Sequence, residues 1–301
     1  MKLSVVIPTG DDRRAQLEGT LERLAAQRDA AFDVLVVDNG ATGAASAFVA
    51  SLAPGYPVPL RSCVEPRAGV SAARNRGVRE AAHEAVLFLN DDTAPGSDRL
   101  VAGHAGALAE RGPGTAVMGR IRYSDALLTD PFMRFLDGHA QFTYEELTDG
   151  PVERPGRVYT AHLSLRRADF ERSGGFDERL VFGFEDAEFA HRLLGSGCAV
   201  DYRSDLLTVH DHPMTLRRWA RRAERMGEAG RLVNQLSDAR PPLAQVPAGP
   251  YWSALAAGAR LIERVPAPYQ RLPPRLRRAV YIVLNQGAYT RGYRRAADTP
   301  C

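Results

Sequence analysis

Two adjacent carboxylates, Asp91 and Asp92, follow an apolar run at residues 86–89, and Pro95 interrupts the strand pattern soon after them. Because a buried strand tolerates no unpaired charge, both are expected at the exposed carboxyl end of that strand. In an open α/β sheet, ligands bind along this edge. Adjacent carboxylates there predict a site for a hard divalent cation, and the cation in turn predicts a ligand that carries phosphate.

Polar residues also end two other predicted strands. Residues 3–7 form an apolar run followed by Thr9, and residues 32–37 form another followed by Asp38. A carboxylate in this position is often only the N-cap of the next helix, and for Asp38 that alternative stays open. Three such strand ends together indicate one polar site along the edge of the sheet.

The elements that would position these residues alternate along the first 90 residues. The spacing of apolar residues predicts helices and strands in turn: helices at 16–26, 44–52 and 71–82, and strands at 3–7, 32–37, 60–64 and 85–89. This order predicts a parallel, doubly wound α/β sheet. Neither a Gly-x-Gly-x-x-Gly nor a Gly-x-x-x-x-Gly-Lys sequence follows the first strand, which disfavours a dinucleotide or P-loop site.

The second half of the chain is less regular. We expect an edge strand at residues 118–123 and another strand at 160–166. The stretch between them, residues 124–156, is irregular and too long for a simple connector, so it is expected to shape a substrate cleft. A last strand at 206–209 ends in a pair of histidines.

Arginines near the third predicted helix favour an anion site. Arg67, Arg74 and Arg76 flank the start of this helix, where Gly69 permits a close approach and Ser71 can cap the helix. Cations beside a helix N-terminus suit a phosphate group. The alternative is a capped surface helix whose arginines are solvated.

Composition limits the class of protein. The chain has 301 residues, of which 45% are hydrophobic, and no apolar run is long enough to span a membrane. The cysteines, Cys63, Cys198 and Cys301, are scattered, so we expect neither a disulfide framework nor a clustered metal site, and a reducing, cytoplasmic setting. The apolar start of the chain is too short for a signal peptide and is predicted to be a strand.

Charge is distributed unevenly. Residues 213–301 carry 16 arginines and 5 acidic residues (+11), whereas residues 1–212 carry 23 basic and 31 acidic residues (−8). Amphipathic segments after residue 216 predict a basic helical extension. It would pack on its own body, form a homodimer or make peripheral contact with an anionic membrane, and these alternatives stay open.

Six short motifs occur in one order: VVIPT (5–9), VVDNG (36–40), GVSAARNRG (69–77), LNDDT (89–93), SGGFDE (173–178) and GFEDAEFAHRL (183–193). In this order and spacing they resemble the family 2 glycosyltransferases of the GT-A fold. The resemblance implies a GT-A type doubly wound, mostly parallel sheet flanked by helices, with a C-terminal helical extension. It divides the chain into three parts: a nucleotide-sugar-binding half (1–122), an acceptor-binding half of the same domain (123–212) and the extension (213–301).

The resemblance also implies roles for single residues. Asp38 would read the base edge, Asp91 would bind the ribose hydroxyls, and Asp186 would be the general base that deprotonates the acceptor. By itself, an acidic residue in a first helical turn is more often a partner of the helix dipole. The full set of implied nucleotide-sugar contacts is Pro8, Thr9, Asp38, Arg67, Arg74, Asp91 and Glu185.

The implied cofactor is Mn²⁺ or Mg²⁺, held by Asp92 at the diphosphate, because a divalent cation stabilises the negative charge of the leaving group. His210 falls where many family members have a metal-ligating histidine, with His212 as the alternative, and imidazole suits Mn²⁺ better than Mg²⁺. The sequence departs from the family at Asn90, where an acid is common, and at His162, where asparagine is frequent.

The predicted function is inverting, metal-dependent transfer of a sugar from a nucleoside-diphosphate sugar to a hydroxyl or amine. The acceptor would be a small molecule, a glycan or a lipid-linked molecule, and no nucleic acid partner is expected. Two alternatives stay open: a sugar-nucleotide nucleotidyltransferase, although residues 8–12 lack its Gly-rich basic loop, and a non-catalytic nucleotide-sugar-binding scaffold. The high Ala and Arg usage is typical of a GC-rich bacterial genome.

Overall fold

The computed structural model describes residues 1–264 and 269–297, and these form two compact units. Unit 1 comprises Met1–Ser124, Tyr144–Val181 and Glu185–His212, and unit 2 comprises Asp125–Thr143, Phe182–Phe184 and Pro213–Cys301. The division at residues 122 and 212 expected from the sequence stays a prediction. Cys63 and Cys198 are free thiols, and Cys301 lies outside the described residues.

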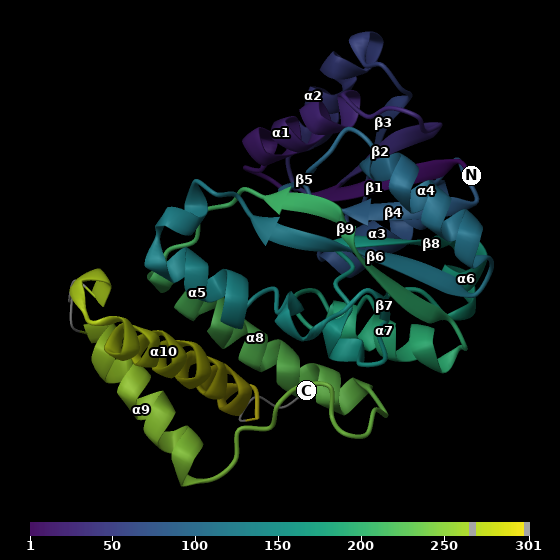
Figure 1. Cartoon of the computed structure of the whole chain (residues 1–301). Coiled ribbons are helices and arrows are strands. Elements are labelled where there is room, and N and C mark those ends of the chain that lie inside the picture. Colours follow the sequence, from purple (N-terminus) through teal and green to yellow (C-terminus); the bar gives the residue numbers. More distant parts are fainter. Residues whose placement is uncertain (265–268, 298–301) are drawn as a thin grey trace. The chain divides into compact units, whose positions relative to one another are not determined.

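Strands and helices alternate through the first part of unit 1, as predicted (Figure 1). The elements are β1 (Leu3–Thr9), α1 (Arg14–Ala25), β2 (Phe32–Asp38), α2 (Ala44–Leu52), the 3₁₀ turn η1 (Ala53–Gly55), β3 (Leu60–Val64), α3 (Val70–Glu80), β4 (Ala85–Leu89), β5 (Thr93–Pro95) and α4 (Leu100–Arg111).

The rest of unit 1 completes the sheet. Its elements are β6 (Thr115–Tyr123), η3 (Tyr144–Glu146), β7 (Gly150–Pro151), η4 (Pro155–Arg157), β8 (His162–Arg166), α6 (Arg167–Arg172), α7 (Glu185–Gly195) and β9 (Ala199–His210). The chain turns sharply before α7, where Phe184 has a positive φ of 63°.

Within the described residues the strands form one sheet in the order β3-β2-β1-β4-β8-β6-β9-β5, and β7 pairs with β9. Strands β1 to β4 are parallel neighbours, whereas β8 runs antiparallel to β4 and β6. The predicted α/β class with a mostly parallel sheet flanked by helices is therefore confirmed. The expectation of an edge strand at 118–123 was wrong, because β6 lies between β8 and β9.

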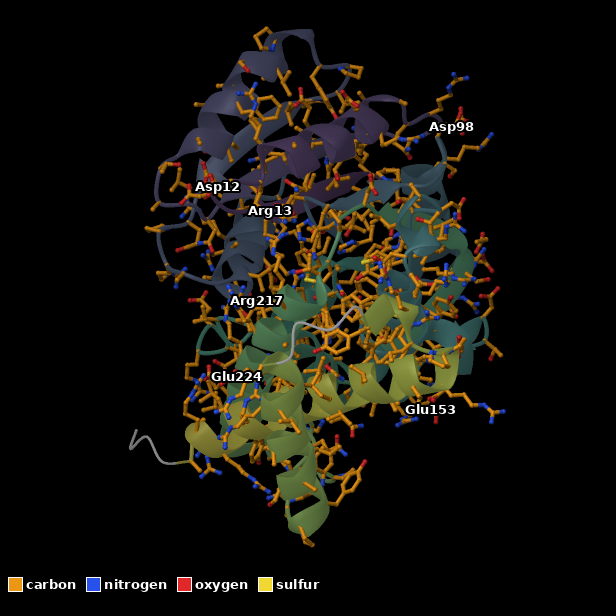
Figure 2. All side chains as sticks on the ribbon, turned by 90° about the vertical axis from the view of Figure 1, so that its left-hand side faces the viewer. Asp12, Arg13, Asp98, Glu153, Arg217 and Glu224 are labelled. Atoms are coloured by element: carbon orange, nitrogen blue, oxygen red, sulfur yellow. The ribbon has the colours of Figure 1, made fainter. Side chains whose placement is uncertain are left out.

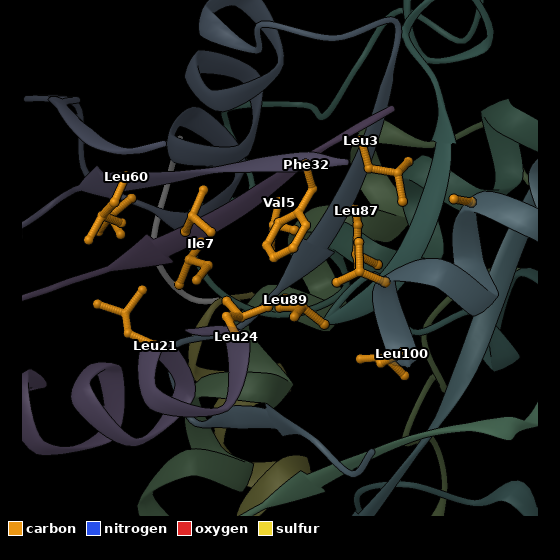
Figure 3. Close-up of a cluster of buried hydrophobic side chains, with 14 of the residues drawn as sticks. Leu3, Val5, Ile7, Leu21, Leu24, Phe32, Leu60, Leu87, Leu89 and Leu100 are labelled. Atoms are coloured by element: carbon orange, nitrogen blue, oxygen red, sulfur yellow. The ribbon is translucent and has the colours of Figure 1, made fainter. Parts of the chain in front are cut away.

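Helices cover both faces of the parallel part of the sheet. On one face Val5 and Ile7 of β1 pack in a buried cluster with Leu21 and Leu24 of α1 (Figure 3). On the other face Val6 meets α3, where a side chain at Gly77 would collide with it. Burial of both faces explains why these strands are continuous apolar runs in the sequence.

Unit 2 is helical. Its elements are η2 (Leu127–Thr129), α5 (Pro131–His139), α8 (Leu216–Leu236), α9 (Pro250–Arg264), η5 (Tyr269–Arg271) and α10 (Pro274–Arg295). The expectation that residues 124–156 are irregular was wrong at α5. This helix begins with Asp130, whose side chain accepts a hydrogen bond from Phe132 N at 2.6 Å, and with Pro131 in its first turn. Both are ordinary helix-start signals.

None of the helices in the described parts of the chain combines the length and the apolar character that crossing a bilayer requires.

Candidate active site

The carboxyl ends of β1, β2 and β4 lie side by side, because these strands are parallel neighbours. Thr9, which follows Pro8 in β1, pairs in register with Asp38, and its hydroxyl donates to Asp91 Oδ2 at 2.7 Å. All three polar side chains are buried. The structure thus brings together the polar strand ends that the sequence singled out.

Asp38 also serves the helix that follows it. Its Oδ1 accepts from Gly40 N at 3.0 Å and its Oδ2 accepts from Ser46 N, in the first turn of α2, at 2.8 Å. Asp38 is therefore not the N-cap residue of α2, which is Gly43, although its carboxylate accepts a hydrogen bond from the first turn of that helix. Each carboxylate oxygen has a second lone pair, so the group still has capacity to accept a hydrogen bond from a ligand.

Arg13, which the sequence interpretation did not single out, binds both carboxylates after β4. Its Nη2 lies 2.6 Å from Asp91 Oδ1 and also contacts Asp92 Oδ2, while its Nε lies 3.1 Å from Asp91 Oδ2. Figure 2 labels Arg13 beside Asp12, just before α1. The turn at residues 8–12 contains no basic residue, but the next residue supplies one.

Ion pairing changes where these carboxylates can lie. The expected exposed position of Asp91 was wrong, since the residue is only 5% exposed and Arg13 compensates its charge. Burial and the neighbouring charge of Asp92 raise the pKa of Asp91 above its ordinary value. Burial acts in the same direction on Asp92, but the electrostatic interactions with His210 and Arg13 outweigh it and lower the pKa of Asp92.

His210 lies beside Asp92, although 118 residues separate them in the sequence. Strand β5 pairs with β9 so that Thr93 is opposite His210, and His210 Nε2 lies 3.6 Å from Asp92 Oδ1. The imidazole is buried against the ring of Tyr123, with the centroids 5.0 Å apart. The alternative ligand, His212, is next to it, with 6.3 Å between the two ring centroids.

These residues fit a divalent cation whose remaining coordination positions the substrate would fill. Asp92 Oδ1 and His210 Nε2 point toward one another and offer one carboxylate oxygen and one imidazole nitrogen. Among the described residues no group of three or more His, Cys, Asp or Glu side chains could hold a metal ion. Cations of this class commonly take one or two protein ligands and fill the remaining places with substrate phosphates and water.

The buried guanidinium of Arg74 joins two further parts of the predicted site. Its Nη2 donates to Asn90 Oδ1 at 3.1 Å, and its Nη1 donates to Asp186 Oδ1 at 3.1 Å and lies 3.6 Å from Glu185 Oε1. Thr160 also donates its hydroxyl hydrogen to Asp186 Oδ1. Predicted residues from α3, from the end of β4 and from the start of α7 therefore meet around one cation.

The other predicted arginines do not join Arg74. Arg67 forms ion pairs with Glu65 at 2.8 Å and with Glu178, and Arg76 pairs with Glu80 on the same helix at 2.9 Å. The interaction with Arg67 lowers the pKa of Glu65 to about 2. Each of the three arginines is thus matched to carboxylates, so the proposed cluster of cations at the start of α3 does not form.

The start of α3 differs from the expectation in a second respect. Ser71 does not cap the helix; it lies inside it and donates to Leu180 O at 2.7 Å. The preceding Gly69 has a φ of 110° and approaches Val181 so closely that a Cβ atom would collide with its backbone. Only glycine accepts both constraints without strain. The loop before α7 is therefore held against the start of α3.

The chain is similar to a known protein family. Residues 4–174 match the model of the family described as "Glycosyl transferase family 2". The chain is 29% identical over 180 residues to a pre-mycofactocin glycosyltransferase of Mycobacterium tuberculosis (58% of this chain, 37% of that protein). It is 31% identical over 225 residues to a validoxylamine A glucosyltransferase of Streptomyces hygroscopicus (65% of this chain, 52% of that protein). The chain therefore matches about half or less of the length of these relatives.

Solved structures share the fold over nearly the whole chain. A mannosyltransferase from Pyrobaculum calidifontis in complex with GDP-Man and Mn²⁺ has a TM-score of 0.60 at 20% identity, covering 96% of this chain and 86% of that one. S. aureus TarS 1-349 in complex with UDP-GlcNAc has a TM-score of 0.57 at 15% identity, covering 98% and 91%. The fold is that of the GT-A glycosyltransferases, and the chain belongs to glycosyltransferase family 2.

Proposed function

We propose that this protein is an inverting, metal-dependent glycosyltransferase that moves a sugar from a nucleoside-diphosphate sugar to a hydroxyl or amine. The observation that carries the proposal is the position of Arg74, whose guanidinium contacts both Asn90, two residues before Asp92, and Asp186. The residues assigned to the donor and the residue assigned as base thus share one edge of the sheet.

Asp186 is suited to be the base. Thr160 and Arg74 both donate to Oδ1, so Oδ2 is the oxygen to which we assign the proton of the acceptor. The acceptor oxygen or nitrogen then bonds to the anomeric carbon, and the bond from that carbon to the diphosphate oxygen breaks. One displacement inverts the anomeric centre, and the nucleoside diphosphate carries away the electron pair.

On the donor side, Asp38 and Asp91 would bind the nucleoside, and Asp92 with His210 would hold Mn²⁺ or Mg²⁺. The cation, when bound, would offset the negative charge that develops on the departing diphosphate. Arg13 keeps Asp92 ionised and fixes it beside His210. Complexes of related folds with GDP-Man and with UDP-GlcNAc support a donor of this class.

Family membership favours this function over the two alternatives. A nucleotidyltransferase would use a cationic loop after β1, but Arg13 is already bound to two carboxylates. A scaffold without activity would not need the carboxylates of Asp92 and Asp186, and both are present and held by hydrogen bonds.

The test is hydrolysis of nucleotide sugars without an acceptor. We expect slow, Mn²⁺-dependent release of nucleoside diphosphate from one member of a panel of UDP-, GDP- and dTDP-sugars. Asp186→Asn should retain nucleotide binding and lose transfer or hydrolysis by about 10² or more, because the general base is gone.

Asp98→Asn is the matched control. Asp98 is an exposed aspartate of the same unit, well separated from Arg13 in Figure 2, and its replacement should leave the rate unchanged. Release of the diphosphate by Asp186→Asn at the rate of the unmodified protein would contradict the assignment of the base.

A further inference from the structure

Unit 2 contains a cavity of about 360 Å³ that the proposed transfer chemistry does not use. All three sequence segments of the unit contribute to its wall, including the end of α5, Phe184, the loop before α9, and helices α8, α9 and α10. Its volume lies in the range of small-molecule sites in proteins.

Aromatic rings form much of the wall. Trp219 of α8, Trp252 of α9, Tyr289 of α10 and Phe184 all line the cavity. The chain has only two tryptophans, and both are here. Large flat rings offer a ligand an apolar surface of defined orientation at low conformational cost.

Primary amides surround these rings: Gln141, Gln245, Asn285 and Gln286. Trp219 Nε1 donates to Asn285 Oδ1 at 2.9 Å, which fixes the indole and leaves the NH₂ group of Asn285 as a donor. Tyr289 is held in the same way, because its hydroxyl donates to the backbone oxygen of Gln245 at 2.9 Å. The wall is therefore positioned before any ligand binds.

Charge narrows the ligand class. Within the part of the chain that the structure describes, Arg222 is the only charged residue that lines the cavity, and no carboxylate does. An alkyl chain would match a wholly apolar wall, and a phosphorylated ligand would need several cations. A sugar ring matches both features: its C–H face packs on an aromatic ring, and its hydroxyls both donate to and accept from amides.

We propose that this cavity binds a neutral carbohydrate, and that this carbohydrate is part of the acceptor. The assignment of this carbohydrate to the acceptor rests on the proposed function. It is supported by the sequence, since Phe184 in the wall is separated from Asp186 by Glu185 alone, so that the two Cα atoms lie within about 7 Å. The cavity thus selects an acceptor that carries a sugar.

Binding of methyl β-D-glucopyranoside and methyl α-D-mannopyranoside, each titrated into the intact 301-residue chain, tests the proposal. Intrinsic tryptophan fluorescence reports on the cavity because both tryptophans line it. We expect a saturable change with at least one glycoside. No saturable change with either, or saturable binding of decanoate alone, would overturn the assignment.

Variants locate the binding. Trp252 and Gln286 are only half-buried, so Trp252→Ala and Gln286→Ala should fold, and each should weaken glycoside binding by about tenfold in calorimetry. Leu261→Ala, at an exposed position of the same helix α9 that does not line the cavity, should stay within about twofold. Equal affinities of all three variants and the unmodified protein would overturn the proposal.

The two proposals fail separately. Glycoside binding without turnover of any nucleotide sugar would refute the proposed function and leave the carbohydrate site standing. Turnover of a nucleotide sugar without glycoside binding would refute the carbohydrate site and leave the proposed function standing.

Discussion

At the scale of single residues, the pairing of charges decides what the edge of the sheet can hold. Asp91 and Asp92 are adjacent, and both are nearly removed from solvent. Without a counter-charge, two such carboxylates would repel one another and one would take up a proton. Arg13 supplies that counter-charge, so Asp92 stays ionised next to His210.

Removing Arg13 should therefore destabilise the protein. Arg13→Ala leaves the buried carboxylate of Asp91 without its ion pair, and we expect a loss of about 3 kcal/mol in the free energy of unfolding measured in urea. Arg14→Ala is the control. Arg14 is exposed and lies over the ring of Phe48, so its loss should cost about 1 kcal/mol or less. Equal stability of Arg13→Ala and the unmodified protein would show that this ion pair does not hold the site.

A buried histidine pair accounts for one departure from the family. His162 Nε2 lies 2.8 Å from His104 Nε2, and the other ring nitrogens face Ser164 and Thr208. Burial lowers the pKa of His104 well below its usual value and that of His162 to about 3. The pair is thus neutral in the folded protein over the physiological range.

This pair predicts a pH dependence of stability. Above about pH 6.5 both histidines are neutral in the folded and unfolded chains, so they contribute no slope. As the pH falls from about 6.5 toward 3, the His162 side chain takes up a proton only in the unfolded chain, and this histidine decreases stability by about 1.4 kcal/mol per pH unit. His162→Asn should reduce the slope between pH 6 and 4 by that amount in urea unfolding. Replacing the exposed His139 by Gln should not, and an unchanged slope in His162→Asn would contradict the burial of the pair.

At the scale of elements, the sequence predicted the first half of the sheet well. In the four parallel strands and three helices up to residue 89, the spacing of apolar residues is regular and polar residues mark the ends. The structure agrees with their predicted bounds to within a few residues. In the second half the pairing is set by long-range contacts. Strand β6 is interior because β8 and β9 flank it, and no local pattern encodes this.

The site residues likewise divide into those that local sequence patterns predict and those that depend on long-range contacts. Thr9, Asp38, Asp91 and Asp92 were accessible to prediction because parallel strands bring their carboxyl ends together. Arg13 and Thr160 were missed because their side-chain partners are distant in the sequence, 78 and 79 residues away for Arg13 and 26 residues away for Thr160. His162 could not be interpreted without His104, because neither residue alone indicates a pair.

Glycines set the packing of the helices in unit 2. A Cβ atom at Gly227 of α8 would collide with the backbone of α10 at Tyr289, and one at Gly292 of α10 would collide with Glu224 of α8. The two helices therefore approach through paired glycines.

Alanine at Gly227 or Gly292 should separate these helices and cost about 1–3 kcal/mol of unfolding free energy. The control is Gly106→Ala in α4, where a Cβ atom meets nothing within 4 Å and alanine should stabilise by about 0.5–1 kcal/mol. Thermal unfolding followed by circular dichroism distinguishes a destabilising substitution at Gly227 or Gly292 from a stabilising one at Gly106. A stabilising effect of Gly227→Ala would contradict the close approach.

At the scale of the whole molecule, the chain combines a GT-A sheet with a basic helical unit. The +11 charge of residues 213–301 contrasts with −8 in the preceding residues. A homodimer formed by this unit, and its contact with a membrane surface, both stay predictions from the sequence. The carbohydrate cavity proposed for unit 2 would give the same helices a role in choosing the acceptor.

We propose that Asp92, which follows β4, and His210, at the end of β9, hold a divalent cation at the diphosphate of the donor. Calorimetry of UDP and GDP binding with and without Mn²⁺ tests it most directly, comparing the unmodified protein, Asp92→Ala and the control Asp98→Ala. We expect Mn²⁺ to tighten nucleotide binding in the unmodified protein and in Asp98→Ala, and to have no effect in Asp92→Ala. An equal effect of Mn²⁺ in Asp92→Ala, or no effect in the unmodified protein, would exclude a metal site at Asp92 and His210.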